Sequence, residues 1–141
     1  MPFPGAVDDH QARNAEYLAE RGGFAYWSHQ PNRSMGGVAS SANGLLSKLE
    51  PVSVSDHPLP GRVKGRGVLL ARFGDGDQGL AIAISHLSLG AASRMSQLAF
   101  IAELLQGHPH AVLMGDFNCT FDRPEMALLY QRTRLQPPTH A

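Results

Sequence analysis

The sequence predicts one mixed α/β (α+β) domain, in which short strands alternate with helices along 141 residues. Three apolar runs predict strands: residues 68–73, 80–87 and 111–118. A stripe of apolar side chains spaced three and four residues apart predicts a helix, and it consists of Leu98, Ile101, Ala102 and Leu105. No segment repeats, and the length suits one ordinary domain with a core.

The first half of the chain predicts a helix followed by two strands. Asp8 or Asp9 can cap the helix, which two consecutive glycines end after about Arg21. Composition then predicts strands over residues 24–28 and 43–49, with a loop rich in Gly, Ser and Asn over residues 31–41.

The second half predicts a hairpin, a helix, a strand and a last helix. Gly and Asp at residues 74–77 turn the first strand of the hairpin back into the second. Ser93 can cap the helix that carries the apolar stripe, which is expected to face the sheet. A final helix over about residues 124–132 follows Asp122, a second candidate cap. Regular structure is expected to end at residues 137–138, which are both proline.

The composition predicts a globular protein without a general affinity for polyanions. Hydrophobic residues make up 43% of the chain, and 12 basic side chains balance 12 acidic ones. The net charge therefore gives no reason to expect a broad surface that binds DNA or anionic membranes. No stretch reaches the ~20 apolar residues of a membrane span, and residues 1–4 lack the features of a signal peptide. The compartment stays open, with the cytoplasm as the default. The single Cys119 excludes an internal disulfide, and a small buried side chain is favoured there over a catalytic thiol.

Polar side chains capable of chemistry end the last predicted strand, in Gly115-Asp116-Phe117-Asn118. Because alternate side chains of a strand point to opposite faces, Asp116 and Asn118 are expected to point the same way and Phe117 into the core. Gly115 would let the backbone approach a neighbour closely. A carboxylate beside an amide can orient a water and hold an anionic phosphate ester without adding a second negative charge. The alternative is that Asp116 and Asn118 merely begin a turn.

His86 ends the strand over residues 80–87, on the same face as Ile82 and Ile84 by alternation. A histidine at the mouth of an apolar strand can donate to a phosphate oxygen and stabilise the charge that builds during attack. A local hydrogen bond at the strand end is the alternative role for a lone histidine.

Four segments follow one another along the chain in an order that is typical of one protein family. They are Asn43-Gly44-Leu45-Leu46-Ser47-Lys48-Leu49 with Ala42 in place of a glycine, Arg66 before a strand, Ser85-His86-Leu87 followed by Arg94 and Gln97, and Val112-Leu113-Met114-Gly115-Asp116-Phe117-Asn118. Together they resemble the central part of the endonuclease/exonuclease/phosphatase superfamily, whose members are similar to deoxyribonuclease I. This resemblance implies a two-sheet β-sandwich flanked by helices, of which the chain would form a part.

The resemblance also implies a metal-dependent phosphoesterase that hydrolyses a phosphodiester or phosphomonoester with an activated water. Asp116 would orient or deprotonate the water, Asn118 would fix the phosphate and the water, and His86 would stabilise the transition state. Asp116 and Asn118 would contact Mg²⁺ or Mn²⁺, while Arg66 and Asn43 would bind the substrate phosphate. The substrates that the resemblance allows are nucleic acids, phospholipids and inositol phosphates, and no obligate protein partner is evident.

Two parts of the superfamily pattern are missing. No Gln-Glu dipeptide occurs, although its glutamate is the superfamily's main metal ligand, and no Asp-His pair follows Asn118. We therefore expect residues 1–141 to form a single partial domain, the central part of a larger one, which is marginally stable and inactive in isolation. The alternative function is a catalytically incomplete fragment or pseudoenzyme that binds at most a phosphate ligand or a protein.

Three further features are expected to be incidental. Residues 55–58, Ser-Asp-His-Pro, spell the missing pair, but they precede His86, so a turn-rich connection is favoured over a circularly permuted site. The His-Pro-His run at residues 108–110 suggests a metal clip, although a surface loop is the commoner outcome. Arg66 belongs to a basic group with Arg62, Lys64 and Arg72, which is typical of a solvated surface.

Overall fold

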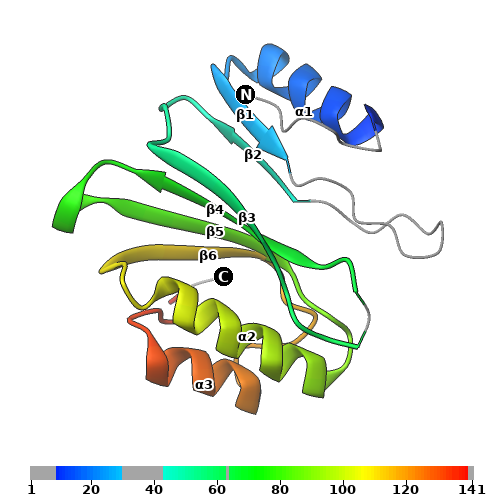
Figure 1. Ribbon diagram of the computed structural model, residues 1–141, viewed down its shortest axis with the longest axis vertical. Coiled ribbons are helices and arrows are strands. Elements are labelled where there is room, and N and C mark those ends of the chain that lie inside the picture. Colours follow the sequence, from blue (N-terminus) through cyan, green and yellow to red (C-terminus); the bar gives the residue numbers. More distant parts are fainter. Residues whose placement is uncertain (1–8, 30–42, 63, 140–141) are drawn as a thin grey trace.

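The chain forms four layers in the computed structural model, which describes residues 9–29, 43–62 and 64–139 (Figure 1). A helix covers a two-stranded sheet, a four-stranded sheet follows, and two helices cover the far face of the second sheet. The elements in chain order are α1 (Asp9–Gly22), β1 (Tyr26–His29), β2 (Gly44–Ser47), β3 (Ser53–Pro58), β4 (Gly67–Phe73), the 3-10 helix η1 (Gly76–Gln78), β5 (Leu80–His86), α2 (Ala91–Leu105), β6 (His110–Asp116) and α3 (Pro124–Arg132). This arrangement confirms the mixed α/β fold with two sheets.

The second sheet has the strand order β3-β4-β5-β6, and its last pair is parallel. β4 and β5 form the expected antiparallel hairpin, whereas α2 carries the chain back across the sheet so that β6 runs parallel to β5. Parallel strands end at the same edge of a sheet, and the register pairs His86 at the end of β5 with Asp116 at the end of β6. The two predicted site segments are therefore neighbours.

The main core lies between the second sheet and its two helices. The predicted stripe of α2 is buried, with Leu98, Ile101 and Ala102 at 0% exposure and Leu105 at 2%. It packs with side chains of the sheet, which are Val68, Leu70, Ala81 and Ala83. Burying a large aliphatic side chain contributes about 1.5–3 kcal/mol, so this face holds α2 and the sheet together.

The opposite face of the second sheet is covered unevenly. Leu69 and Ala71 on β4 are fully buried, but Val112 and Met114 on β6 are 41% and 42% exposed. The apolar face is therefore least covered along β6.

The structure corrects one element that the sequence predicted as a loop. Residues 53–58 form β3, which pairs antiparallel with β4 from Ser53 to Pro58. Pro58 is tolerated because it ends an edge strand, where a missing N–H costs little. Pairing with an apolar neighbour outweighed the turn-like composition of this segment.

Both helix caps predicted in the second half were wrong. α2 begins one turn earlier than expected, after Gly90, and the Ser93 hydroxyl accepts from the Arg62 backbone N–H at 3.5 Å. Arg123 is the residue before α3, while Asp122 accepts a hydrogen bond from Thr120. The Ser93 side chain has its partner in a separate loop and the Asp122 side chain has its partner within its own turn, and no helix pattern reveals either contact.

The other elements agree with the sequence to within a few residues. α1 ends at the expected glycines. The strand predicted over residues 24–28 appears as β1, displaced toward the C-terminus, and the strand predicted over residues 43–49 appears as the shorter β2. The loop predicted over residues 31–41 and the cap at Asp8 lie outside the described residues. None of the described helices is long and apolar enough to cross a membrane.

Candidate active site

An imidazole and a carboxylate meet at the carboxyl edge of the second sheet. His86 Nε2 lies 3.7 Å from an Asp116 carboxylate oxygen, Oδ2. The His86 side chain is 34% exposed and the Asp116 side chain 65% exposed, so both can be reached from solvent. The backbone holds them together, since the Leu87 N–H donates to the Asp116 carbonyl at 2.9 Å.

Asn118 joins this pair through a turn. β6 ends at Asp116, and Asn118 has a positive φ of 52°, a conformation that asparagine tolerates better than most residues. Its backbone N–H donates to Asp116 Oδ1 at 3.0 Å, and its side-chain Nδ2 donates to the Leu87 carbonyl at 2.6 Å. The expectation that the strand continues through Asn118 is wrong, but the turn brings Asn118 back to the segment that follows His86.

Gly115 sets the spacing of the two strands at the site. Its φ is +136°, and a Cβ at this position would lie 1.8 Å from the Ser85 carbonyl oxygen. Glycine alone permits so close an approach, which confirms the role expected for this residue. Ser85 and Gly115 directly precede His86 and Asp116, so this contact fixes the distance between the two functional side chains.

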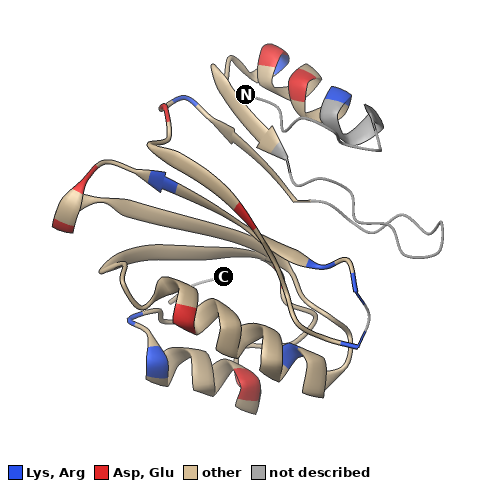
Figure 2. Ribbon diagram, viewed as in Figure 1, with Lys and Arg blue, Asp and Glu red and all other residues tan. Residues whose placement is uncertain are grey.

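Arg66 and Asn43 lie next to the site. Their contact with a substrate phosphate stays a prediction. Arg66 Nη1 donates to the His86 carbonyl at 3.3 Å, and Asn43 Nδ2 donates to the Gly67 carbonyl at 3.2 Å. Lys and Arg gather on the loop that joins β3 to β4, where Arg62 and Lys64 are exposed (Figure 2). This loop gives the site edge a local positive charge in a chain with no net charge.

A buried ion pair supports the loop after His86. Arg94 Nη2 and Nε donate to Glu125 Oε1 at 2.9 Å and 3.1 Å, and both side chains are almost fully buried. Arg94 Nη1 also donates to the carbonyls of Ser88 and Leu89. A hydrogen bond from its own backbone N–H, together with Arg94, lowers the pKa of Glu125 although burial opposes this shift.

Gln97 holds the same loop from α2. Its Oε1 accepts from the Ser88 N–H at 2.9 Å, and its Nε2 donates to the Ser88 hydroxyl at 2.8 Å and the Pro60 carbonyl at 3.0 Å. The sequence pattern included Arg94 and Gln97 but missed Ser88 and Glu125. From sequence, a glutamate in the first turn of α3 indicates only a favourable interaction with the helix dipole. It does not indicate an ion pair with a residue 31 positions away.

The remaining candidates stay outside this site. On β3, Ser55 Oγ lies 2.9 Å from His57 Nε2, and the His57 ring centroid lies 6.5 Å from that of Phe100 on α2, so His57 packs toward the helical layer. Burial raises the pKa of the half-buried Cys119 thiol, which disfavours a reactive thiolate there. Within the described residues, no three or more His, Cys, Asp or Glu side chains come together as a possible metal site.

Two solved structures share this architecture. The human Nocturnin catalytic domain, solved with a bound sulfate anion, is 16% identical with a TM-score of 0.64, over 85% of this chain and 52% of that chain. Sphingomyelinase C from Streptomyces griseocarneus is 18% identical with a TM-score of 0.63, over 92% of this chain and 55% of that chain. These likenesses show the fold, which is the deoxyribonuclease I-like fold.

The chain belongs to the Endonuclease/Exonuclease/phosphatase family, whose model matches residues 6–140. The resemblance carried by the four sequence segments is thereby confirmed, and the family is one of phosphoesterases and nucleases.

A local sequence match points to a different kind of protein. A UDP-N-acetylglucosamine–N-acetylmuramyl-(pentapeptide) pyrophosphoryl-undecaprenol N-acetylglucosamine transferase from Aromatoleum aromaticum is 39% identical over 72 residues. The match takes in 51% of this chain and 18% of the transferase. The chain thus spans less than a fifth of this curated relative and about half of the solved structures, and the transferase activity is not carried over.

Proposed function

We propose that this chain carries part of the active site of a metal-dependent phosphoesterase. The observation that carries the proposal is the meeting of His86 and Asp116 at the ends of two parallel strands, with Asn118 tied to both segments. General acid–base work and phosphate binding need an imidazole, a carboxylate and an amide within reach of one ligand. The family match supports hydrolysis as the reaction class.

Each side chain takes a role that its contacts allow. Asp116 orients the attacking water or accepts its proton, since its carboxylate is largely exposed. His86 donates to a phosphate oxygen and stabilises the charge that develops there. Asn118 uses one amide hydrogen on Leu87, which leaves a second hydrogen and the amide oxygen for phosphate or water.

The oxygen donors of the site fit Mg²⁺ or Mn²⁺. Asp116 and Asn118 supply carboxylate and amide oxygens, and the exposure of Asp116 leaves room for the waters that Mg²⁺ retains. When bound, the cation would neutralise charge on the phosphate and on the leaving oxygen. Arg66 and Asn43 would add hydrogen-bond donors for the substrate phosphate at the same edge of the sheet.

Hydrolysis of an aryl phosphodiester by the larger domain that we expect to contain this chain, with Mg²⁺ or Mn²⁺ present, tests this proposal. Asp116→Asn is expected to abolish turnover, and His86→Ala to slow it about 10²–10³-fold, by analogy with the loss of one oxyanion donor. The rate is measured from the release of the coloured phenolate. Asp77→Asn and His108→Ala are matched controls outside the site and should keep the wild-type rate. Equal rates for wild type and His86→Ala would contradict the role of His86.

A second candidate is a catalytically incomplete module that binds phosphate or a protein. The absence of a three-ligand acidic or histidine cluster among the described residues, together with the missing Gln-Glu dipeptide, favours it for the chain alone. It predicts no turnover with either metal. A titration with inorganic phosphate would then distinguish a phosphate-binding module from a protein-binding one. Binding is measured from the changes in the NMR amide chemical shifts of residues 86–88 and 116–118.

A further inference from the structure

The loop between β3 and β4, residues 59–66, leaves the second sheet at the edge that carries the candidate active site. Because the end of β3, the start of β4 and the end of β5 meet at this edge, the loop lies beside His86. Its base is closed by a hydrogen bond from the Leu59 N–H to the Arg66 carbonyl at 2.9 Å. Arg66 Nη1 also donates to the His86 carbonyl at 3.3 Å, so the loop is in direct contact with the site.

The loop is fixed in position by α2 and the main core. Gln97 of α2 is 0% exposed, and its Nε2 donates to the Pro60 carbonyl at 3.0 Å while its Oε1 holds Ser88. Gly61 passes so close to Gln97 that a Cβ there would lie 3.1 Å from Nε2. Leu59 is 7% exposed and packs in the main core. Residues of this chain make all of these contacts, so they hold the loop in place without a ligand.

The side chains of this loop carry positive charge and no negative charge. Its sequence contains Arg62, Lys64 and Arg66 and no acidic residue. Arg62 and Lys64 are exposed, and no carboxylate of the described residues forms an ion pair with any of the three cations. Arg94 and Arg123, by contrast, share one glutamate of α3. Three cations without a counter-ion beside a phosphate site favour a ligand with more than one negative group.

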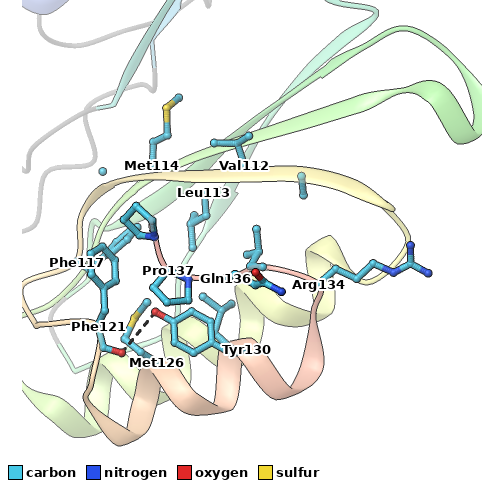
Figure 3. Close-up of a pocket in the computed structure, with 15 residues that line it drawn as sticks. Val112, Leu113, Met114, Phe117, Phe121, Met126, Tyr130, Arg134, Gln136 and Pro137 are labelled. Atoms are coloured by element: carbon cyan, nitrogen blue, oxygen red, sulfur yellow. Dashed lines mark hydrogen bonds between the residues drawn. The ribbon is translucent and has the colours of Figure 1, made fainter. Parts of the chain in front are cut away.

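A groove between β6 and α3, of about 460 Å³, has no comparable set of charges (Figure 3). Among the described residues that line it, Arg134 is the only charged one, and most of the others are apolar. Figure 3 shows Arg134 at the end of the groove away from Phe117, which is the residue after Asp116. An anionic substrate is therefore expected to extend from the site toward the loop over residues 59–66 and not into this groove.

We propose that Arg62 and Lys64 bind a second phosphate group of the substrate, next to the phosphate that the active site holds. This inference rests on the proposed phosphoesterase site, and it narrows the substrate class to esters that carry a further phosphate near the scissile one. Arg66 stands at the end of the loop that contacts His86, and Lys64 and Arg62 lie two and four positions further from it along the chain.

The chemistry of these side chains suits that ligand. Arginine and lysine bind phosphate through charge-assisted hydrogen bonds, and arginine can use two of its N–H groups on one phosphate. A nucleic-acid strand and a small bisphosphorylated molecule, such as an inositol bisphosphate, both present two phosphates to neighbouring cations. A simple monophosphate ester presents one, so it would leave Arg62 and Lys64 without a ligand.

Ligand binding tests the second phosphate subsite without depending on hydrolysis. Thymidine 3′,5′-bisphosphate and thymidine 5′-monophosphate form one matched pair of ligands, and inositol 1,4-bisphosphate and inositol 1-phosphate form another. Calorimetry measures their dissociation constants with the larger domain that we expect to contain this chain, in an Asp116→Asn background that prevents turnover. At least one bisphosphate is expected to bind about tenfold more tightly than its monophosphate, since two exposed ion pairs are added.

Single substitutions test the two cations. Arg62→Gln and Lys64→Gln should each weaken binding of that bisphosphate about fivefold, the upper end for an exposed ion pair, and change monophosphate binding by no more than about twofold. Arg72→Gln is the matched control, because Arg72 is an exposed cation at the opposite end of β4. It should change the binding of neither ligand.

Two results would overturn the proposal: equal binding of both bisphosphates and their monophosphates by the wild-type loop, or the same loss in the Arg72 variant as in the loop variants. The ligand pair with the larger preference identifies whether the second phosphate belongs to a nucleotide or to an inositol. A bisphosphate preference without any phosphodiester turnover in the unsubstituted domain would support the subsite and contradict hydrolysis, so the two failures are distinguishable.

Gly61→Ala tests the position of the loop separately from its charge. The substitution strains the backbone at a φ of +147° and brings a Cβ to 3.1 Å from Gln97 Nε2, so it should displace the loop and reduce the bisphosphate preference. Gly76→Ala is the control, because Gly76 also has a positive φ but lies in the hairpin at the other end of the sheet. A bisphosphate preference that Gly61→Ala leaves at the wild-type value would contradict the role given to the anchored loop.

Discussion

At residue 115 the backbone of β6 approaches β5 so closely that a side chain would collide with it. The position combines a positive φ with the Ser85 carbonyl in the place of a Cβ. The alignment of His86 with Asp116, one residue further along each strand, depends on this approach.

Gly115→Ala is therefore expected to destabilise the fold by more than about 2 kcal/mol, from backbone strain of about 1–3 kcal/mol and an overlap of similar cost. Urea unfolding followed by circular dichroism measures the free energy of unfolding. Gly107→Ala is the control, because its Cβ would meet nothing within 4 Å, and it should change stability by no more than about 0.5 kcal/mol. Equal stabilities for the two variants would refute the proposed role of the contact.

The sequence predicted the residues of the candidate site better than it predicted the backbone conformation and the hydrogen bonds that position them. The close backbone approach at Gly115 and the place of His86 at the end of a strand followed from residue types and period, and both are confirmed. The turn at Asn118 did not follow, because an asparagine is compatible with both an extended and a left-handed backbone. Only its bonds to Asp116 and Leu87 decide between the two.

At the scale of elements, Arg94 and Glu125 join α2 to α3 and both to the loop after His86. The sequence pattern included Arg94, but it could not identify a partner on another helix. Removing one member of a buried pair leaves the other charge uncompensated, and this is costly even where the pair itself adds little net stability.

Glu125→Gln should lower the free energy of unfolding by about 3 kcal/mol, the lower end of the range for broken buried pairs, since the amide oxygen can still accept one bond. Glu103→Gln, an exposed site on α2, is the control and should be nearly neutral. Chemical denaturation at pH 7 measures both. A neutral effect of Glu125→Gln would show that Arg94 is satisfied by the loop carbonyls alone.

The same variant should reveal a pH dependence. The folded-state pKa of Glu125 lies below its ordinary value of 4.5, so its contribution is fully present above that value and is lost as the pH falls through the folded-state pKa. The stability difference between wild type and Glu125→Gln should thus be constant at neutral pH and shrink in acid. Denaturation curves from pH 7 to about pH 3 measure it, and a difference that grows in acid would contradict the assigned shift.

At the scale of the molecule, stability is expected to be unevenly distributed. Residues 68–71 of β4 are at most 5% exposed, at the centre of the larger sheet. β1 and β2 form a sheet of two strands, which is marginal without further packing. The exposed face of β6 adds to the reasons for expecting a marginally stable chain.

Hydrogen exchange should therefore be slowest in β4 and β5 and fastest in β1 and β2, because local opening of the small sheet does not disturb the main core. Mass spectrometry of peptides from exchanged protein resolves these segments. Equal protection of both sheets would instead indicate one cooperative unit.

Much of the architecture could be predicted because the hairpin and the stripe of α2 are local patterns. β3 could not, since its Ser-Asp-His-Pro sequence resembles a turn and its strand character comes from pairing with β4. The exposed β6 face was equally hidden, because strand order decides which apolar strand lies at an edge.

The turn of the β4–β5 hairpin lies at the end of the sheet opposite His86. Residues 74–78 are exposed, and the seven residues of β5 separate them from the imidazole. A fluorophore or affinity tag inserted there could report on, or capture, the protein without perturbing the chemistry of its active edge.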